Sequence, residues 1–266
     1  MNKLNILKKL AILFFIIYGA ETMAKTSIVA SNFSAPTGIA FNQTGDMFVT
    51  NWSGQSIIKI SPNGQRETFY SNIASPAGIV IDQDNNLYVA SYSGNYILRI
   101  NEKGEGTIIS DNFHTPTGIA LSKSGDLLIS NRSSGEIVSL NLKTGSKKIM
   151  ANRLTTPVGV TELPNGDLVV SQYSGRLTLI KTNGLQTELG TDFIRPGVGI
   201  ITASNDTVVV IDNGAGAVRS VNVQTGKSEL LAAELHGAVA LAFYKNNYYV
   251  GTWNNGSIHI LNKTEQ

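Results

Sequence analysis

Short hydrophobic runs separated by polar turns make up most of the chain. In the segment Pro36–Pro62, a Pro-x-Gly triplet leads into the apolar run Ile39–Phe41, and further runs follow at Met47–Thr50 and Ser56–Ile60. Glycine, asparagine, aspartate and proline occupy many positions between them. Runs of β-branched and aromatic residues bounded by such turn residues are typical of antiparallel strands joined by hairpins. Each run therefore predicts one strand.

The segment returns five more times along the chain. The repeats start near residues 36, 76, 116, 157, 197 and 238, so their spacing is 40 or 41 residues. A fixed period near 40 residues with strand-type content is typical of β-propeller blades. The first strand of each repeat is expected to be the innermost, where its glycine permits close approach of the neighbouring backbone. These glycines are Gly38, Gly78, Gly118, Gly159 and Gly199.

The two ends of the repeat array complement each other. Thr26–Phe33 has the character of a fourth strand but precedes the first repeat, whereas the sixth repeat ends after its third strand, Ser257–Leu261. Pairing these two segments would close a ring and remove the open sheet edges. We therefore predict one all-β domain over residues 25–266, a six-bladed β-propeller of four-stranded antiparallel blades closed by the N-terminal strand. The other predicted fourth strands are Thr68–Ile73, Thr107–Phe113, Lys148–Leu154, Glu188–Ile194 and Glu229–Leu235.

Residues 1–24 have the pattern of a signal peptide. Three lysines precede the apolar run Leu10–Tyr18, and the small residues Thr22 and Ala24 fit a cleavage site that would leave Lys25 as the first mature residue. An uncleaved N-terminal anchor is the alternative. With cleavage, no membrane span remains, and export of a chain without cysteine favours a bacterial periplasmic or secreted location.

Composition narrows the possible chemistry. The chain contains no cysteine, so it can form neither a disulfide nor a thiolate metal site. Its net charge is only +2, which gives no overall attraction to nucleic acid. Neither a strained nucleophile turn nor a glycine-rich nucleotide motif follows any predicted strand.

The repeat resembles that of a known group of propellers. The pattern of Pro36-Thr37-Gly38-Ile39-Ala40, followed by Gly45-Asp46 before the second strand, is similar to the NHL repeat and to the streptogramin lyase and SMP-30/gluconolactonase propellers. The resemblance extends over Thr26–Asn262 and implies a six-bladed fold. Since these propellers include lyases, lactonases and binding proteins, it implies no single activity.

The chain departs from the enzymes of that group where their chemistry resides. The resemblance implies a histidine and glutamate site with a metal in the lyases, and a Glu, Asn and Asp site around a channel metal in the lactonases. Here the ends of the second strands carry no glutamate, and no glutamate precedes Gly38. We therefore expect no recognisable catalytic constellation and no bound cofactor. A divalent cation near Asp212, with the neighbouring amides, would be weakly held.

One face of the predicted ring gathers unusual side chains. The loops between second and third strands, and between fourth and first strands, should lie on the same face because the strands of a blade alternate in direction. Four second-strand loops carry an aromatic residue at one equivalent position, and the other two carry Arg132 and Asp212 there. The aromatic residues are Trp52, Tyr92, Tyr173 and Trp253. Such a ring suits a sugar, a flat ligand or a peptide; alternatively, each aromatic side chain packs between blades.

The remaining candidates on this face are polar. Asn51 precedes the first tryptophan, and His114, Arg195 and His236 lie in loops that enter blades. The arginines would meet a carboxylate or a phosphate. The preferred hypothesis is an exported monomer that binds a small molecule, a glycan or an envelope protein. A lyase or lactone hydrolase with an atypical site built on His114, His236, Arg195 and Asp212 is the alternative, and a scaffold for another envelope protein is a third reading.

Overall fold

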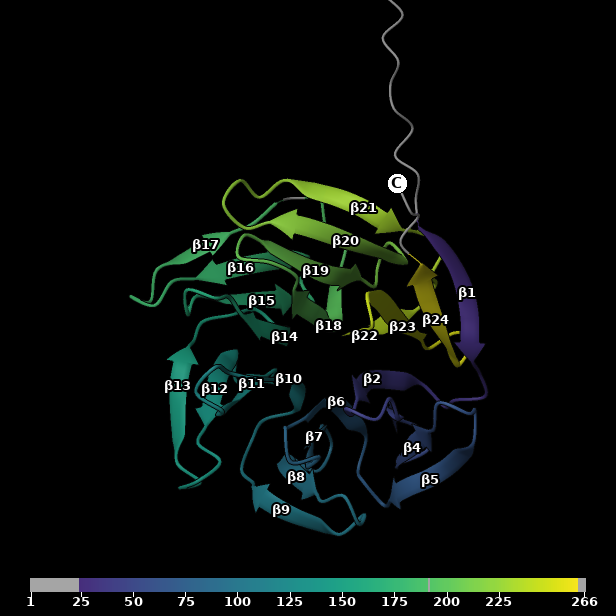
Figure 1. The fold of residues 1–266 in the computed structure, drawn as a ribbon. Coiled ribbons are helices and arrows are strands. Elements are labelled where there is room, and N and C mark those ends of the chain that lie inside the picture. Colours follow the sequence, from purple (N-terminus) through teal and green to yellow (C-terminus); the bar gives the residue numbers. More distant parts are fainter. Residues whose placement is uncertain (1–23, 191, 263–266) are drawn as a thin grey trace, which may run out of the picture.

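The computed structural model describes residues 24–190 and 192–262, and it contains twenty-four strands in six four-stranded antiparallel sheets. The sheets are arranged as blades around a central axis (Figure 1). This arrangement confirms the predicted six-bladed propeller. Within these two ranges, no helix has the length and apolarity needed to cross a membrane. The predicted signal peptide lies, except for Ala24, outside the described residues.

The strands follow the repeat in order. Blade one contains β2 (Pro36–Phe41), β3 (Met47–Asn51), β4 (Ser56–Ile60) and β5 (Arg66–Ser71). Blade two contains β6 (Pro76–Ile81), β7 (Leu87–Ser91), β8 (Tyr96–Ile100) and β9 (Gly106–Ser110). Blade three contains β10 (Pro116–Leu121), β11 (Leu127–Asn131), β12 (Glu136–Leu140) and β13 (Lys147–Ala151). Blade four contains β14 (Pro157–Glu162), β15 (Leu168–Gln172), β16 (Arg176–Ile180) and β17 (Gln186–Glu188). Blade five contains β18 (Pro196–Thr202), β19 (Thr207–Asp212), β20 (Ala217–Asn222) and β21 (Ser228–Ala232).

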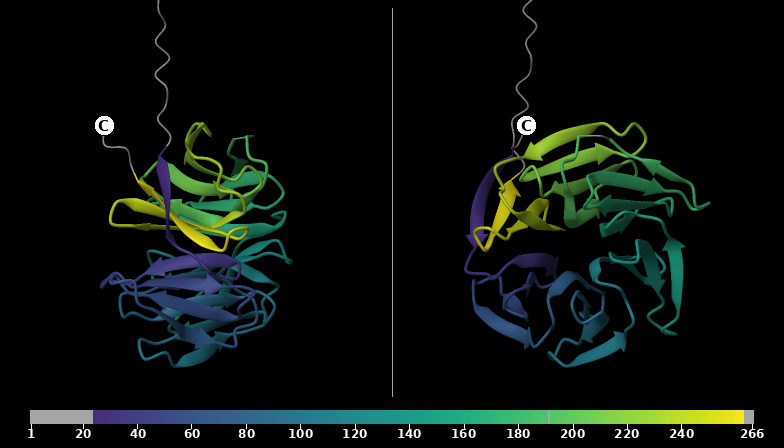
Figure 2. Two further views of the ribbon diagram at one scale, coloured as in Figure 1. Left: turned by 90° about the vertical axis from the view of Figure 1, so that its right-hand side faces the viewer. Right: turned by 180° about the vertical axis from the view of Figure 1, so that it is seen from behind.

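The sixth blade closes the ring. Its strands β22 (Ala238–Tyr244), β23 (Asn247–Thr252) and β24 (Ser257–Asn262) are completed by β1 (Lys25–Ala30), which pairs antiparallel with β24. The register places Thr26 opposite Leu261 and Ala30 opposite Ile258. Figures 1 and 2 show β1 as the outer strand of this blade, beside β24. The predicted closure is therefore confirmed.

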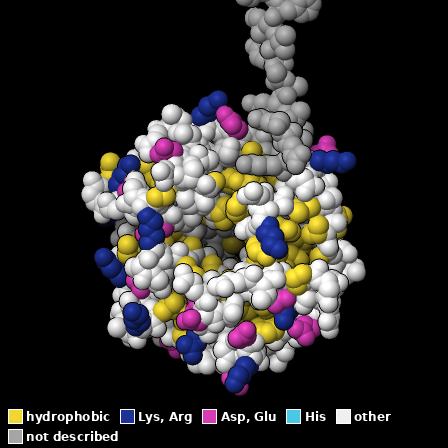
Figure 3. All heavy atoms as spheres, viewed as in Figure 1, with side chains coloured by type: hydrophobic (Ala, Val, Ile, Leu, Met, Phe, Trp, Pro, Cys, Tyr) yellow, Lys and Arg dark blue, Asp and Glu magenta, His cyan; other side chains and the backbone are white. Residues whose placement is uncertain are grey.

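The inner strands meet tightly at the axis. A Cβ atom added to Gly38 would lie 2.7 Å from the carbonyl oxygen of Ala77 in the next blade, and one added to Gly78 would lie 2.7 Å from that of Thr117. Real Cβ atoms do not approach backbone oxygen so closely, so only glycine fits. Figure 3 shows one face of the ring, with a hollow near its centre and hydrophobic side chains around it.

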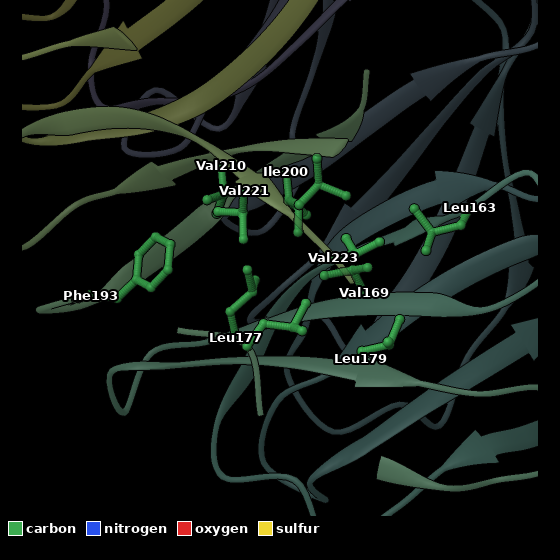
Figure 4. Close-up of a cluster of buried hydrophobic side chains, with 11 residues drawn as sticks. Leu163, Val169, Leu177, Leu179, Phe193, Ile200, Val210, Val221 and Val223 are labelled. Atoms are coloured by element: carbon green, nitrogen blue, oxygen red, sulfur yellow. The ribbon is translucent and has the colours of Figure 1, made fainter. Parts of the chain in front are cut away.

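Hydrophobic side chains fill the spaces between blades. One cluster joins Val169 and Leu177 of blade four to Val210 and Val221 of blade five, and Figure 4 shows these side chains pointing toward one another. All four are fully buried or nearly so. A separate cluster of this kind lies between each pair of neighbouring blades, so every blade is packed on both sides.

The fourth strands end earlier than the hydrophobic pattern predicts. The predicted strand Glu188–Ile194 corresponds to a three-residue strand, β17, which ends at Glu188. Phe193, near the end of the predicted strand, is 7% exposed and packs into the core from a loop. Ile73, at the end of another predicted strand, is likewise fully buried beyond β5. An apolar residue at this position anchors the loop that enters the next blade, and alternation alone cannot distinguish it from a strand residue.

Candidate functional site

The last residue of most second strands holds the loop that enters the same blade. Asn51 Oδ1 accepts a hydrogen bond from the backbone N–H of Ser34 at 2.5 Å, and Asn131 Oδ1 accepts one from His114 at 2.6 Å. Gln172 does the same for Thr155. Each of these side chains is at least 90% buried. Their role in this structure is to satisfy buried backbone donors.

Asp212 belongs to this buried set. It is fully buried, and its two carboxylate oxygens accept hydrogen bonds from the backbone N–H groups of Ile194 and Arg195 at 3.1 and 2.9 Å. The Nε atom of Arg219 lies 3.7 Å away. The prediction that Asp212 occupies the position of the aromatic residues on this face was therefore wrong. Its neighbours are donors and a cation, which suit a carboxylate without any metal ion.

The strand register corrects the aromatic position in blade five. Asp212 lies opposite Pro196, just as Asn51 lies opposite Pro36. The residue equivalent to Trp52 is therefore Asn213, one position further on. The dipeptides Asn51-Trp52 and Asp212-Asn213 could have been aligned in this way from the sequence, because a polar residue precedes the ring position in both.

A pocket of about 600 Å³ lies on the face formed by the predicted loops. Its wall comes from the loops after the second strands and from the loops that enter blades five and six. Its floor comes from the first residues of the inner strands. The wall includes Trp52, Tyr92, Arg132, Tyr173, Arg195, Asn213, His236, Trp253 and Asn254, and the floor includes Thr37, Thr117, Val158, Val198 and Val239.

Aromatic side chains form a continuous arc on one side of this pocket. The ring centroids of Trp52 and Trp253 are 5.8 Å apart, and those of Trp52 and Tyr92 are 4.8 Å apart, with tilted planes in both pairs. The indole Nε1–H of Trp253 donates to Thr37 Oγ1 at 3.2 Å. The two tryptophans, which come from blades one and six, therefore lie side by side across the ring closure. Trp253 is 41% exposed, so part of its surface is free for a ligand.

Two arginines continue the arc. Arg132 Nη1 donates to the Tyr92 hydroxyl at 2.8 Å, and its guanidinium carbon lies 5.7 Å from the ring centroid of Tyr173. The guanidinium carbon of Arg195 lies 5.2 Å from the same centroid. The Tyr173 hydroxyl contacts Asn213 Oδ1 at 3.3 Å, and Asn213 Nδ2 donates to the carbonyl of Ala238 at 2.9 Å. Cation–π contacts of this kind hold both guanidinium groups beside the pocket.

The structure brings seven of the ten candidate residues together at the pocket. The three others lie elsewhere: Asn51 and Asp212 are buried beneath the loops, and His114 is exposed outside the lining. Sequence reasoning missed Asn213, Asn254 and the floor threonines Thr37 and Thr117. The repeat offered a signal for Thr37 and Thr117, because both follow the proline of their Pro-x-Gly triplets. Both residues are almost fully buried, and Thr37 accepts the hydrogen bond of Trp253.

The pocket is cationic in character. Among the residues that the structure describes, its lining contains two arginines and one histidine, with neither aspartate nor glutamate. Over residues 24–190 and 192–262, no three histidine or carboxylate side chains gather in a metal-binding group. The atypical catalytic set is also dispersed, since Arg195 and His236 line the pocket whereas His114 and Asp212 do not.

Comparison with solved structures places this fold among familiar propellers. A gluconolactonase from Xanthomonas campestris superposes with a TM-score of 0.81 at 12% identity, covering 90% of this chain and 89% of that chain. A virginiamycin B lyase from Staphylococcus aureus gives 0.66 at 16% identity, covering 91% and 89%. A structure of a nidogen–laminin complex gives 0.65 at 18% identity, covering 73% and 79%. No protein-family model matches the chain, and no curated protein matches its sequence.

These likenesses agree with the group that the repeat resembles. At identities between 12 and 18%, they show the six-bladed fold alone. The same architecture occurs in two enzymes and in a complex between proteins, so any function of this chain must be argued from its pocket.

Proposed function

We propose that this protein binds a small molecule with a planar part in the pocket of about 600 Å³ at the mouth of the propeller. The aromatic arc is the observation that carries the proposal. Trp253, Trp52 and Tyr92 offer adjacent ring faces, and rings at such positions bind flat ligands by stacking and by burial of apolar area. The volume falls in the range of small-molecule sites.

Binding to a large partner is a weaker proposal. A flat aromatic surface would favour a protein partner or a glycan, whereas the arc here forms one side of a concave pocket. Catalysis is the second candidate, because His236 lies in the lining and two of the similar structures are those of enzymes. Within residues 24–190 and 192–262, no carboxylate lines the pocket to act with His236, and this favours binding over general acid–base chemistry.

Export remains part of the proposal. The predicted cleavage site after Ala24 coincides with the start of the fold, since β1 begins at Lys25. A signal peptide removed there would leave the propeller whole. Mass spectrometry of the protein from the cell envelope or medium is expected to show a chain that starts at Lys25; a chain that retains Met1 in the membrane fraction would contradict it.

The two tryptophans make the pocket easy to monitor. They are the only tryptophans of the chain, and both line the pocket. A planar uncharged probe, N-phenyl-1-naphthylamine, should therefore quench their fluorescence by energy transfer when it binds. We expect saturable binding of one probe per chain. Trp253→Ala should weaken it about tenfold, within the roughly 1–3 kcal/mol expected for the loss of a stacking side chain.

Stability must be measured on the same variants. Trp253 is partly exposed, so Trp253→Ala should change the melting temperature little, whereas Trp52 also packs against the buried cluster between blades two and three. Trp253→Phe, which keeps an aromatic face, is the matched control and should retain most of the affinity. Binding that does not saturate, or that Trp253→Ala leaves unchanged while the protein is destabilised, would contradict the proposed pocket.

A further inference from the structure

The charges around the pocket are unbalanced. Arg132 and Arg195 lie in its lining, where the described part of the chain contributes no aspartate or glutamate. Among the described residues, neither arginine forms an ion pair with a carboxylate within 4 Å. The carboxylate of Asp212 lies below and is occupied by the backbone N–H groups of Ile194 and Arg195. The positive charge therefore faces the pocket without a protein counter-ion.

Both guanidinium groups contact the same aromatic ring. Both lie over the ring of Tyr173, at 5.7 and 5.2 Å from its centroid, so their carbon atoms can be no farther apart than the sum, about 11 Å. Arg132 uses one donor on the Tyr92 hydroxyl. A guanidinium group has five N–H donors in a planar fork, so several remain for a ligand. Each guanidinium group therefore has donors for an oxyanion, which arginine binds through paired hydrogen bonds.

We propose that the ligand of this pocket is a planar organic anion whose carboxylate, phosphate or sulfate group is bound by Arg132 and Arg195. The inference rests on the proposed binding function and names its ligand class. The apolar part of the ligand would contact Trp52 and Trp253. These two rings extend the arc from Tyr92 in the direction away from Tyr173. The anionic group would lie near Tyr173, between the arginines of blades three and five.

Other ligand classes leave these arginines unused. A neutral sugar could stack on the tryptophans but would gain no charge pairing. A cation would be repelled by two positive side chains in a concave site, where walls of low polarity strengthen electrostatic interactions. An anion without an apolar part would leave the aromatic arc uncovered. A ligand with both features makes use of the whole lining.

A pair of probes that differ in one charged group tests this inference. 8-Anilino-1-naphthalenesulfonate carries the ring system of N-phenyl-1-naphthylamine with an added sulfonate, which stands in for the natural oxyanion. We expect the sulfonate probe to bind at least about tenfold more tightly than the uncharged probe, the factor that a charge-assisted hydrogen bond supports. Its affinity should fall as sodium chloride is raised from 0.02 to 0.5 M.

The variants assign the charge to its residues. Arg195→Gln should weaken sulfonate binding about tenfold and leave binding of the uncharged probe within about twofold. Arg132→Gln should also weaken sulfonate binding about tenfold. This variant has a further effect on the pocket, because it removes the hydrogen bond that Arg132 donates to Tyr92. The matched control is Arg99→Gln, at an exposed position in β8 outside the pocket lining, which should change neither affinity.

The outcomes separate the two proposals. If the uncharged probe binds saturably but the sulfonate gives no advantage, or Arg195→Gln leaves the sulfonate affinity unchanged, the anion assignment is overturned while the binding function stands. If neither probe binds, both proposals fail. If Arg99→Gln lowers the sulfonate affinity as much as Arg195→Gln, the effect is one of net charge and the assignment to the pocket is also overturned.

Discussion

Adjacent residues at the end of each second strand have different roles. The last strand residue points into the protein and holds a loop, as Asn51 does, whereas the next residue points into the pocket, as Trp52 does. Side chains alternate between the two faces of a strand, so a shift of one position exchanges buried and exposed roles. For this reason Asp212 is a structural residue and Asn213 is a pocket residue.

A substitution series at Asp212 tests this structural role. Asp212→Asn keeps one acceptor oxygen for the N–H groups of Ile194 and Arg195, so it should cost less than Asp212→Ala. The alanine variant leaves buried donors without partners, and we expect it to lower the free energy of unfolding by about 1–3 kcal/mol per unsatisfied group. Urea denaturation of both variants measures the difference.

Cation addition provides the matching control. If Asp212 instead held a divalent cation, calcium or magnesium would raise the melting temperature of the wild type but not that of Asp212→Asn. We expect no shift in either protein, because the carboxylate already has two N–H donors and the Arg219 side chain around it. A cation-dependent shift confined to the wild type would contradict the structural assignment.

The sequence predicted the pocket better than it predicted individual roles. The repeat located Trp52, Tyr92, Tyr173 and Trp253 because equivalent positions in equivalent blades must lie on one circle. It could not show that His114 is outside the lining, since the direction of a loop side chain depends on local backbone conformation. The polar contacts among Arg132, Tyr92 and Tyr173 likewise join different blades and have no signature in one sequence.

At the scale of the strand, hydrophobic alternation located elements well but set some ends poorly. The predicted run Ser56–Ile60 coincides with β4, whereas the predicted fourth strand Glu188–Ile194 shares only Glu188 with β17. The two middle strands of each sheet, such as β4, are hydrogen-bonded to neighbours on both sides. The outer strands have a neighbour on one side alone, and their ends are decided by how each following loop buries its apolar anchor.

The strand β24 carries a histidine whose titration should affect stability. His259 lies opposite Ile28 of β1 and Val250 of β23, and partial burial lowers its pKa below the usual 6.5. Between that value and the lowered pKa, the unfolded chain binds more protons at this position than the folded chain does. Stability should therefore decrease as the pH falls through this window, and the loss should level off below the folded pKa.

Thermal melts at pH 7.5 and 5.5 test this prediction. His259→Gln should show a smaller decrease in melting temperature between the two pH values than the wild type shows. His236→Gln, which removes an exposed histidine from the pocket wall, controls for the loss of one imidazole. An equal decrease in the wild type and in His259→Gln would show that other groups account for the acid sensitivity.

At the scale of the whole molecule, the ring depends on a strand from the opposite end of the repeat array. The side chains of β1 contribute little burial, since Ile28 is 58% and Val29 is 48% exposed. Its main contribution is the ladder with β24, whose register extends from Lys25 opposite Asn262 to Ala30 opposite Ile258. The sequence predicted this closure from the count of strands alone, because a closed ring of equal blades leaves no other partner for either segment.

Removal of β1 should therefore destabilise the protein through lost backbone pairing. We expect a chain that starts at Asn32 to melt roughly 10 °C or more below a chain that starts at Lys25. Each lost backbone hydrogen bond removes about 0.5–1.5 kcal/mol of stability. In a domain of this size, each 1 kcal/mol shifts the melting temperature by about 2–4 °C. It should also aggregate, because β24 becomes an unprotected edge. The double variant Ile28→Ser/Val29→Ser keeps the ladder while removing exposed apolar side chains, and it should melt close to the full propeller. A shortened chain that melts like the chain from Lys25, or a double variant as unstable as the deletion, would show that the ladder is not what closes the ring.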